Sequence, residues 1–227
     1  MCVAEFDANP ILSAEQKLLL NQLSASSLRE YFYLTGGTAL AAFYLHHRYS
    51  DDLDLFSEQP VPIEPIAAFL RSLPGAVRSD YEQKFDRRMF LVRFQTSATL
   101  KVEFTLYPFT RLEHGRTVDG IALDSLHDIL VNKLAAMTER HDAKDYADIY
   151  CSAKLSGRVD IARLSVEAEK KFGIQGIRYS LMRRFMQVPP SVSSLRMLTP
   201  LTDQELQEFF LSTARNWVNA SLEENPS

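Results

Sequence analysis

Cysteine and long apolar segments are scarce in this sequence, and each shortage excludes a class of protein. The two cysteines, Cys2 and Cys151, are isolated and have no metal-binding spacing, which fits a reducing cytoplasm. The longest wholly apolar run, Ala39 to Leu45, is far too short to span a membrane. The first residues lack the basic start and apolar stretch of a secretion signal. We therefore expect a cytoplasmic protein with no membrane partner.

An excess of positive charge is also missing. The formal net charge is -4 at pH 7, whereas strong sequence-independent binding to nucleic acid usually requires a basic domain. Lys170–Lys171 and Arg183–Arg184 are the candidates for a local basic surface, although such pairs more often lie on the solvated face of a helix. At 227 residues, with 46% hydrophobic and 24% charged residues, the chain is long and apolar enough for one large or two small globular domains.

Hydrophobic periodicity changes near Asp124. Before it, apolar residues alternate in short segments, which predict strands over residues 31–34, 52–56, 87–95 and 99–107. After it, the period is helical over residues 125–140, 142–154, 160–171, 177–187 and 202–221. We predict an α/β (α+β) fold with two domains: a mixed-sheet core with an N-terminal helix over residues 1–124, and an all-helical domain over residues 125–227.

The first candidate site follows the first strand. Gly36 and Gly37 open a helix directly after that strand, and backbone N–H groups at a helix N-terminus favour phosphate. Asp52 and Asp54 stand at i, i+2 in the next strand, which puts both carboxylates on one face, roughly 6.5–7 Å apart. A phosphate site beside paired acids predicts phosphoryl or nucleotidyl transfer with Mg²⁺ or Mn²⁺. The alternatives are an ordinary strand-to-helix turn and a solvated acidic edge.

The second candidate site is a lysine in an apolar stripe. Lys133 lies near the centre of that stripe on the helix 125–140, and Arg140 falls on the same side. A lysine facing a core needs a partner or a route to solvent. Its partner is either the phosphates of a nucleotide in a cleft or an ion pair with Asp145 or Asp148, one turn apart on the next helix. Asp145 also suits a helix cap or dipole partner.

Two segments containing these sites resemble the AbiEii/AbiGii-type toxin family of the nucleotidyltransferase superfamily. They are GGTALAAFYLHHRYSDDLDLF and, downstream, KLAAMTER with KDYADI. The resemblance implies a nucleotidyltransferase-like sheet whose helical domain closes the cleft. It implies transfer of a nucleoside monophosphate from NTP to an acceptor hydroxyl, with RNA such as the 3′ end of tRNA as acceptor. A cognate antitoxin is the implied protein partner.

The resemblance also implies roles for individual residues. Glu103 occupies the strand position where the superfamily places a third carboxylate, commonly Asp; the alternative is an exposed glutamate paired with Lys101 or Arg93. Arg48 is an implied phosphate contact, although positive charge at a helix C-terminus is stabilising by itself. The expected metal ligands are Asp52, Asp54 and Glu103. The expected catalytic residues add Lys133 and Asp148. The expected nucleotide-binding residues are Gly36, Gly37, Thr38, Arg48, Lys133 and Arg140.

Two other functions fit the same residues. A transferase of the same fold can modify a small molecule or a protein side chain, and the acidic net charge slightly favours that class. A catalytically silent module can use the fold to hold a partner. The joint presence of Asp52, Asp54, Glu103 and Lys133 argues against the silent module, because it has no chemical need for the set.

Overall fold

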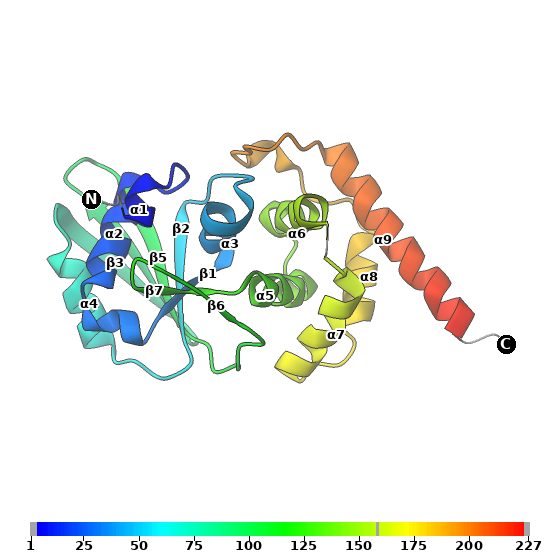
Figure 1. Ribbon diagram of the computed structural model, residues 1–227, viewed down its shortest axis with the longest axis horizontal. Coiled ribbons are helices and arrows are strands. Elements are labelled where there is room, and N and C mark those ends of the chain that lie inside the picture. Colours follow the sequence, from blue (N-terminus) through cyan, green and yellow to red (C-terminus); the bar gives the residue numbers. More distant parts are fainter. Residues whose placement is uncertain (1–3, 158, 225–227) are drawn as a thin grey trace. The chain divides into compact units, whose positions relative to one another are not determined.

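The computed structural model describes residues 4–157 and 159–224. The chain divides into two compact units, Met1–Leu126 and His127–Ser227, each with its own internal contacts (Figure 1). The predicted domain boundary lies two residues before this division. Within the described residues, no helix has both the length and the apolar character that crossing a membrane requires. Cys2 lies outside the described residues, and Cys151 is buried.

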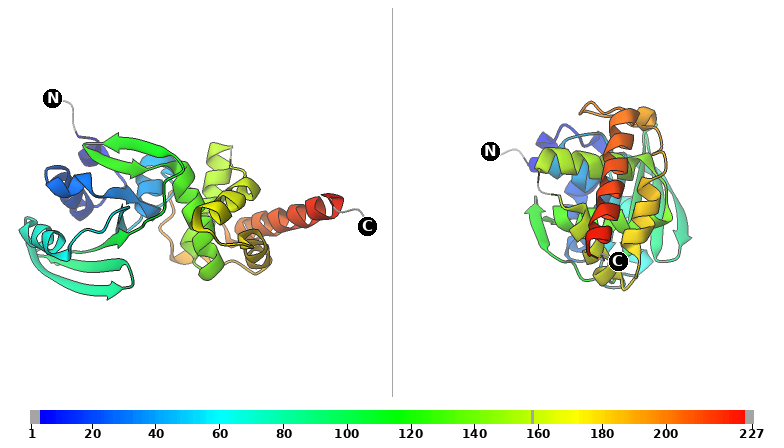
Figure 2. Two further views of the ribbon diagram at one scale, coloured as in Figure 1. Left: turned by 90° about the horizontal axis from the view of Figure 1, so that it is seen from below. Right: turned by 90° about the vertical axis from the view of Figure 1, so that its right-hand side faces the viewer.

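The first unit contains a mixed seven-stranded sheet, in the order β3-β4-β5-β2-β1-β7-β6 among the described residues. The strands are β1 (Tyr33–Thr35), β2 (Asp52–Ser57), β3 (Ala76–Lys84), β4 (Arg87–Phe94), β5 (Thr99–Leu106), β6 (His114–Val118) and β7 (Ile121–Asp124). The β2–β5 and β1–β7 pairs are parallel and the others are antiparallel. Hairpins β3–β4 and β6–β7 form the two edges of the sheet (Figure 2).

One face of this sheet makes the core of the first unit. Leu53 and Leu55 are fully buried and alternate along β2 with the half-buried Asp52 and Asp54. Phe104 of β5 belongs to the same apolar face and contributes about 1.5–3 kcal/mol by burial. The helical segments are α1 (Glu5–Ala8), α2 (Ala14–Ser24), η1 (Ser27–Glu30), α3 (Gly36–Leu40), the π-helical η2 (Ala41–Leu45) and α4 (Ile63–Ser72). Of these, α2 contacts β5 and β7, and α4 contacts β3.

The second unit is helical, which confirms the prediction for residues after 125. Its elements are α5 (Leu126–Glu139), α6 (Ala143–Ser156), α7 (Ile161–Phe172), α8 (Ile177–Phe185), η3 (Val192–Ser194) and α9 (Asp203–Glu224). Aromatic rings link α6, α8 and α9: the centroid of Phe210 lies 4.8 Å from that of Tyr146 and 4.7 Å from that of Phe185. Each observed helix begins and ends within a few residues of its predicted bounds.

Three strands are absent from the sequence prediction. These are β3, β6 and β7, which lie at or next to the edges of the sheet. Most residues of β3 are exposed, so its sequence AVRSDYEQK has no apolar alternation to recognise. The strand predicted at 31–34 is observed at Tyr33–Thr35, because residues 27–30 form the 3₁₀ turn η1.

Candidate active site

The glycine turn brings backbone directly against a carboxylate. Gly36 has φ +70°, and a Cβ at this position would overlap the carboxylate of Asp54. At Gly37 a Cβ would stand 2.7 Å from Nη2 of Arg48. At Gly36 only glycine gives both the left-handed backbone and this close approach. The turn therefore places main chain beside one acid and one base.

The carboxylates of β2 form part of a polar row across the sheet. Asp54 pairs in register with Thr35 of β1 on one side and with Glu103 of β5 on the other. Asp52 pairs with Lys101, whose Nζ lies 3.2 Å from Oδ2 of the aspartate. Neighbouring strands are about 4.8 Å apart, so Asp54 and Glu103 are adjacent on one face.

Glu103 is buried, and its partner differs from both predicted ones. Arg87 donates from Nε to Oε1 and from Nη2 to Oε2, both at 2.6 Å, and the Thr105 hydroxyl donates to Oε1 at 2.7 Å. The alternative of an exposed glutamate paired with Lys101 or Arg93 is therefore wrong. Burial alone raises the pKa of Glu103, but the hydrogen bonds from Arg87 and Thr105 and the nearby positive charges outweigh it and hold the pKa below its ordinary value.

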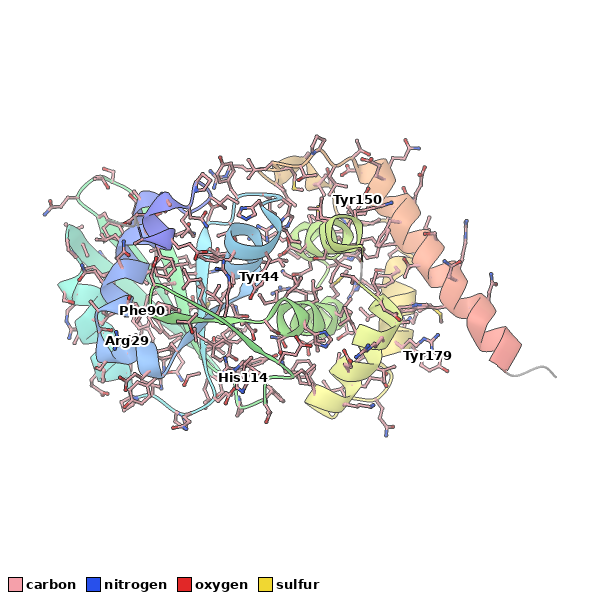
Figure 3. The ribbon with its side chains drawn as sticks, in the orientation of Figure 1. Arg29, Tyr44, Phe90, His114, Tyr150 and Tyr179 are labelled. Carbon is pink, nitrogen blue, oxygen red and sulfur yellow. The ribbon has the colours of Figure 1, made fainter. Side chains whose placement is uncertain are left out.

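Asp124 extends the polar row and was not predicted as a site residue. It is fully buried at the end of β7, and its Oδ2 accepts a hydrogen bond of 2.7 Å from the Thr35 hydroxyl. The hydroxyl of Tyr44, a residue labelled in Figure 3, donates to the backbone carbonyl of Asp124 at 2.6 Å. An aspartate between a short strand and a helix looks like a helix cap in sequence. Its contact with Thr35 follows from the pairing of β1 with β7, which the sequence does not show.

Thr38 and Arg48 are buried beside the glycine turn and bond to backbone carbonyls. Both are buried; the Thr38 hydroxyl donates to the backbone carbonyl of Asp52, and Arg48 donates from Nη1 to the carbonyl of Tyr49 at 2.9 Å. Thr38 therefore ties the helix to the start of β2. The helix ends at Leu45, and His46 adopts φ +53°. The predicted phosphate contacts of Thr38 and Arg48 stay predictions.

The donor set fits a two-carboxylate magnesium site better than a three-carboxylate one. Mg²⁺ is usually held by one or two carboxylates together with substrate phosphates, and Asp52 and Asp54 share the half-buried side of β2. Both oxygens of Glu103 already accept hydrogen bonds from the guanidinium of Arg87. In the part of the chain that the structure describes, no group of three or more His, Cys, Asp and Glu side chains is arranged to hold a metal ion.

The second unit gathers the downstream motif into one buried cluster. Lys133 Nζ lies 3.1 Å from Oδ1 of Asp145 and 2.5 Å from Oδ2 of Asp148. Arg140 donates to both oxygens of Asp145, at 2.6 and 3.0 Å. Burial raises the pKa of Asp145, but Lys133 and Arg140 outweigh it and lower the pKa. The ion pair, one of the two alternatives for Lys133, is thus present. Asp142 is the helix cap, accepting from the backbone N–H of Lys144.

A second buried lysine was missed. The side chain of Lys171 is 2% exposed, and its Nζ lies 2.6 Å from Oδ1 of Asp128 and 2.9 Å from Oδ1 of Asn132. Both alternatives for Lys171, a basic surface and a solvated face, are therefore wrong. Arg184 also has an internal role, because it donates to the carbonyls of Met137 and Thr138 at the C-terminal end of α5.

Comparison with known proteins connects this geometry to a family. Residues 17–218 match the family model described as the nucleotidyl transferase AbiEii toxin of type IV toxin–antitoxin systems. An uncharacterized protein of Aquifex aeolicus (strain VF5) is 31% identical over 165 residues, which are 71% of this chain and 76% of that one.

Two solved structures share the fold. A candidate nucleotidyltransferase from H. pylori aligns with a TM-score of 0.58 at 19% identity, over 94% of this chain and 98% of its own. MenT4, a nucleotidyltransferase toxin from Mycobacterium tuberculosis H37Rv, aligns with a TM-score of 0.56 at 16% identity, over 89% and 85%. The predicted fold class, a mixed sheet followed by helices, is confirmed.

Proposed function

Because the chain belongs to the AbiEii family of nucleotidyl transferase toxins from type IV toxin–antitoxin systems, we propose that it transfers a nucleoside monophosphate from an NTP to an acceptor hydroxyl at the Gly36–Asp54 site. The observation that carries this proposal is the contact between the Gly36 backbone and the Asp54 carboxylate. It places main chain that can bind phosphate next to the pair of acids. In the reaction the acceptor oxygen bonds to the α-phosphorus and pyrophosphate leaves.

Each residue of the first unit has a proposed task. Asp52 and Asp54 would hold Mg²⁺ or Mn²⁺, which when bound neutralises phosphate charge and lowers the pKa of the attacking hydroxyl. The Gly36–Gly37 backbone binds the triphosphate, and Arg48 adds positive charge beside Gly37. Thr38 fixes the distance between this turn and β2 through its bond to the Asp52 carbonyl.

The downstream cluster has proposed roles in the same reaction. Lys133 and Arg140 are proposed contacts of the NTP phosphates, and Asp148 is proposed to orient Lys133, to which it is bonded. The proposed roles rest on the family motif. The observed ion pairs support only the orienting part, because a lysine held by two carboxylates keeps one position.

For the acceptor we propose RNA, such as the 3′ end of tRNA, with a cognate antitoxin as the protein that restrains the activity. The family assignment supports this choice. The net charge of -4 favours the second candidate, a small molecule or protein side chain as acceptor.

The test is a transfer assay with each α-labelled NTP, Mg²⁺ and total RNA. We expect label on RNA with wild-type protein, and none after chelation of Mg²⁺ or with Asp54→Asn. Label on a protein or a small molecule identifies the second candidate. Persistent transfer by Asp54→Asn contradicts the proposed site, and the absence of any labelled product from all four NTPs contradicts the proposed reaction.

A further inference from the structure

The third carboxylate of the site is already occupied by protein groups. Glu103 lies beside Asp54 in register, yet Arg87 and Thr105 donate three hydrogen bonds to its two oxygens. A carboxylate offers about four lone-pair positions, so little capacity is left for another ligand. The guanidinium also repels any divalent cation that approaches Glu103. The superfamily role of a third metal ligand therefore does not fit this residue.

The two partners of the Arg87–Glu103 ion pair differ in solvent exposure. The Glu103 side chain is 5% exposed, whereas that of Arg87 is 46% exposed. Arg87 pairs in register with Thr105, and Phe56 pairs with Thr105 from the other side. Since side chains alternate along a strand, Arg87, Glu103 and Asp54 share one face. The buried carboxylate thus fixes a guanidinium that reaches the surface on the face of Asp52 and Asp54.

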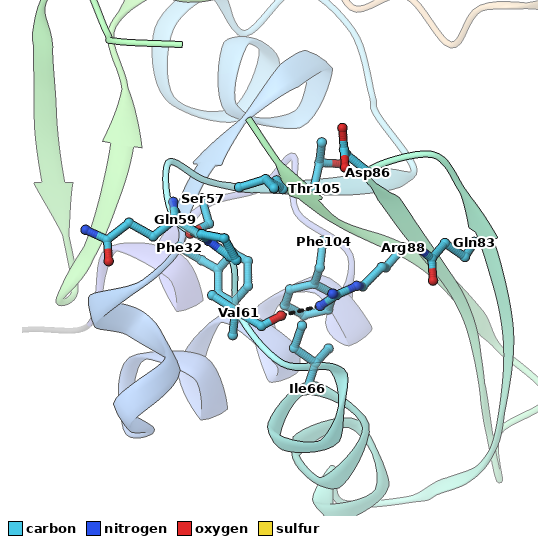
Figure 4. Close-up of a pocket in the computed structure, with 12 residues that line it drawn as sticks. Phe32, Ser57, Gln59, Val61, Ile66, Gln83, Asp86, Arg88, Phe104 and Thr105 are labelled. Carbon is cyan, nitrogen blue, oxygen red and sulfur yellow. Dashed lines mark hydrogen bonds between the residues drawn. The ribbon is translucent and has the colours of Figure 1, made fainter. Parts of the chain in front are cut away.

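The neighbouring Arg88 shows the opposite orientation. It donates to the carbonyl of Val61 beside a small cavity of about 60 Å³, lined by Ile66 and Phe104 among others, on the apolar face (Figure 4). That cavity is too small for a nucleotide, since ligand sites usually measure roughly 300–1,000 Å³. Of the two adjacent arginines, only Arg87 belongs to the face of the acids.

We propose that Glu103 is an anchor for Arg87 and not a metal ligand, and that Arg87 binds a phosphate group of the substrate beside Asp52 and Asp54. The inference rests on the proposed nucleotidyl transfer and names a further binding residue for it. A planar guanidinium, with its donors in a fixed fork, is suited to bidentate recognition of phosphate. The phosphate belongs either to the NTP or to the backbone of an RNA acceptor.

Arg93 provides a matched control for Arg87. It stands on the same strand and face, its side chain is 48% exposed, and it pairs with a carboxylate, Asp80, at 3.1 Å. It is six residues further along β4, roughly 20 Å away. Arg93 pairs in register with Thr99, so Arg93→Gln removes the same charge and a comparable ion pair at the Asp52 end of the row, away from Glu103.

The binding test uses the full chain with ATP, the other three NTPs and purified tRNA. We expect Arg87→Gln to weaken binding of the NTP or of tRNA roughly ten- to a hundredfold, the effect of losing a hydrogen bond to a charged group. Loss confined to NTP identifies the nucleotide phosphate, and loss confined to tRNA identifies the acceptor backbone. Arg93→Gln should change neither. Equal affinities of the Arg87→Gln and Arg93→Gln variants for both ligands overturn the proposal.

Arg87→Gln leaves the buried Glu103 without this partner, so the double variant Arg87→Gln/Glu103→Gln is measured as well. We expect it to bind phosphate ligands as weakly as Arg87→Gln, because anchor and arginine act as a unit. Mn²⁺ binding to Glu103→Gln, followed by electron paramagnetic resonance, should equal that of wild type, whereas Asp54→Asn should lose it. Loss of Mn²⁺ by Glu103→Gln overturns the anchor role. If wild-type protein binds no NTP, the proposed function fails instead.

Discussion

At the scale of single residues, the candidate site is built on close contacts between the main chain and polar side chains. Gly36 allows the main chain to touch Asp54, and Thr38 bonds the carbonyl of Asp52. Sequence spacing was enough to propose Gly36, Asp52 and Asp54 as site residues, because strand alternation and glycine geometry are local properties. The partner of Glu103 was not predictable in this way, since Arg87 is 16 residues away and reaches it only through the register of β4 and β5.

The first prediction concerns Gly36→Ala. A left-handed backbone costs a non-glycine residue about 1–2 kcal/mol, and the new methyl must also displace the Asp54 carboxylate. We expect loss of stability together with loss of transfer activity. Gly75→Ala is the matched control, because Gly75 has φ +75° with nothing within 4 Å of its Cβ position. It should lose only the backbone cost of about 1–2 kcal/mol, measured by thermal unfolding, and keep full activity. Normal transfer by Gly36→Ala would rule out a need for close packing at Asp54.

The second prediction concerns Lys133→Met. This variant keeps the apolar stem but takes the ammonium away from the buried Asp145 and Asp148. Removing one partner of a buried ion pair costs about 3–5 kcal/mol, so the melting temperature should fall markedly. Lys144→Met, on the exposed side of α6, should melt like wild type. NTP affinity is measured on the same variants: a large melting loss with normal affinity removes Lys133 from nucleotide binding and leaves it a structural role.

At the scale of elements, the helices of the second unit were predictable and the edge strands were not. Helical periodicity is clear along α7 and α8, where the buried residues recur on one side of each helix. In β3 most residues are exposed, so hydrogen bonding to β4 is what makes it a strand. The buried pair between α5 and α7 was also hidden, because Lys170–Lys171 has the composition of a solvated surface. The packing of α7 against α5 buries the side chain of Lys171 and leaves Lys170 exposed, and the sequence does not show this difference.

The third prediction uses those adjacent lysines. Lys171→Met should destabilise the protein by about 3–5 kcal/mol, because it leaves Asp128 without its ammonium partner in a buried site. Lys170→Met removes the same charge from an exposed position and should change stability by less than about 0.5 kcal/mol. Denaturant unfolding of both variants measures the difference. Equal stabilities would contradict the buried ion pair and restore the basic-surface interpretation.

At the scale of the whole molecule, each unit depends on a buried carboxylate that must stay ionised. Glu103 does so in the sheet and Asp145 in the helical unit, and positive partners lower both pKa values. The side chains of Lys133 and Lys171 are themselves buried in ion pairs, which places part of the chain's basic charge inside the fold. The molecule therefore offers less free positive charge to RNA than its composition implies.

The last prediction is an acid limit to the stability of the helical unit. The pKa of Asp145 is lowered from 3.8 in the folded protein, so its stabilising contribution is present above the unfolded value and is lost as pH falls below 3.8 and through the folded value. We expect Asp145→Asn to be less stable than wild type by about 3–5 kcal/mol at pH 7. That difference should shrink steadily as the pH drops below 3.8.

Trp217, the single tryptophan of the chain, lies on α9 and reports unfolding of this unit by fluorescence. Asp160→Asn, which removes the charge of an exposed helix cap but keeps an oxygen that accepts from the backbone N–H of Arg163, is the control, and it should change stability by less than about 0.5 kcal/mol. A difference between wild type and Asp145→Asn that stays constant to the lowest pH would show that the carboxylate charge does not hold this cluster together.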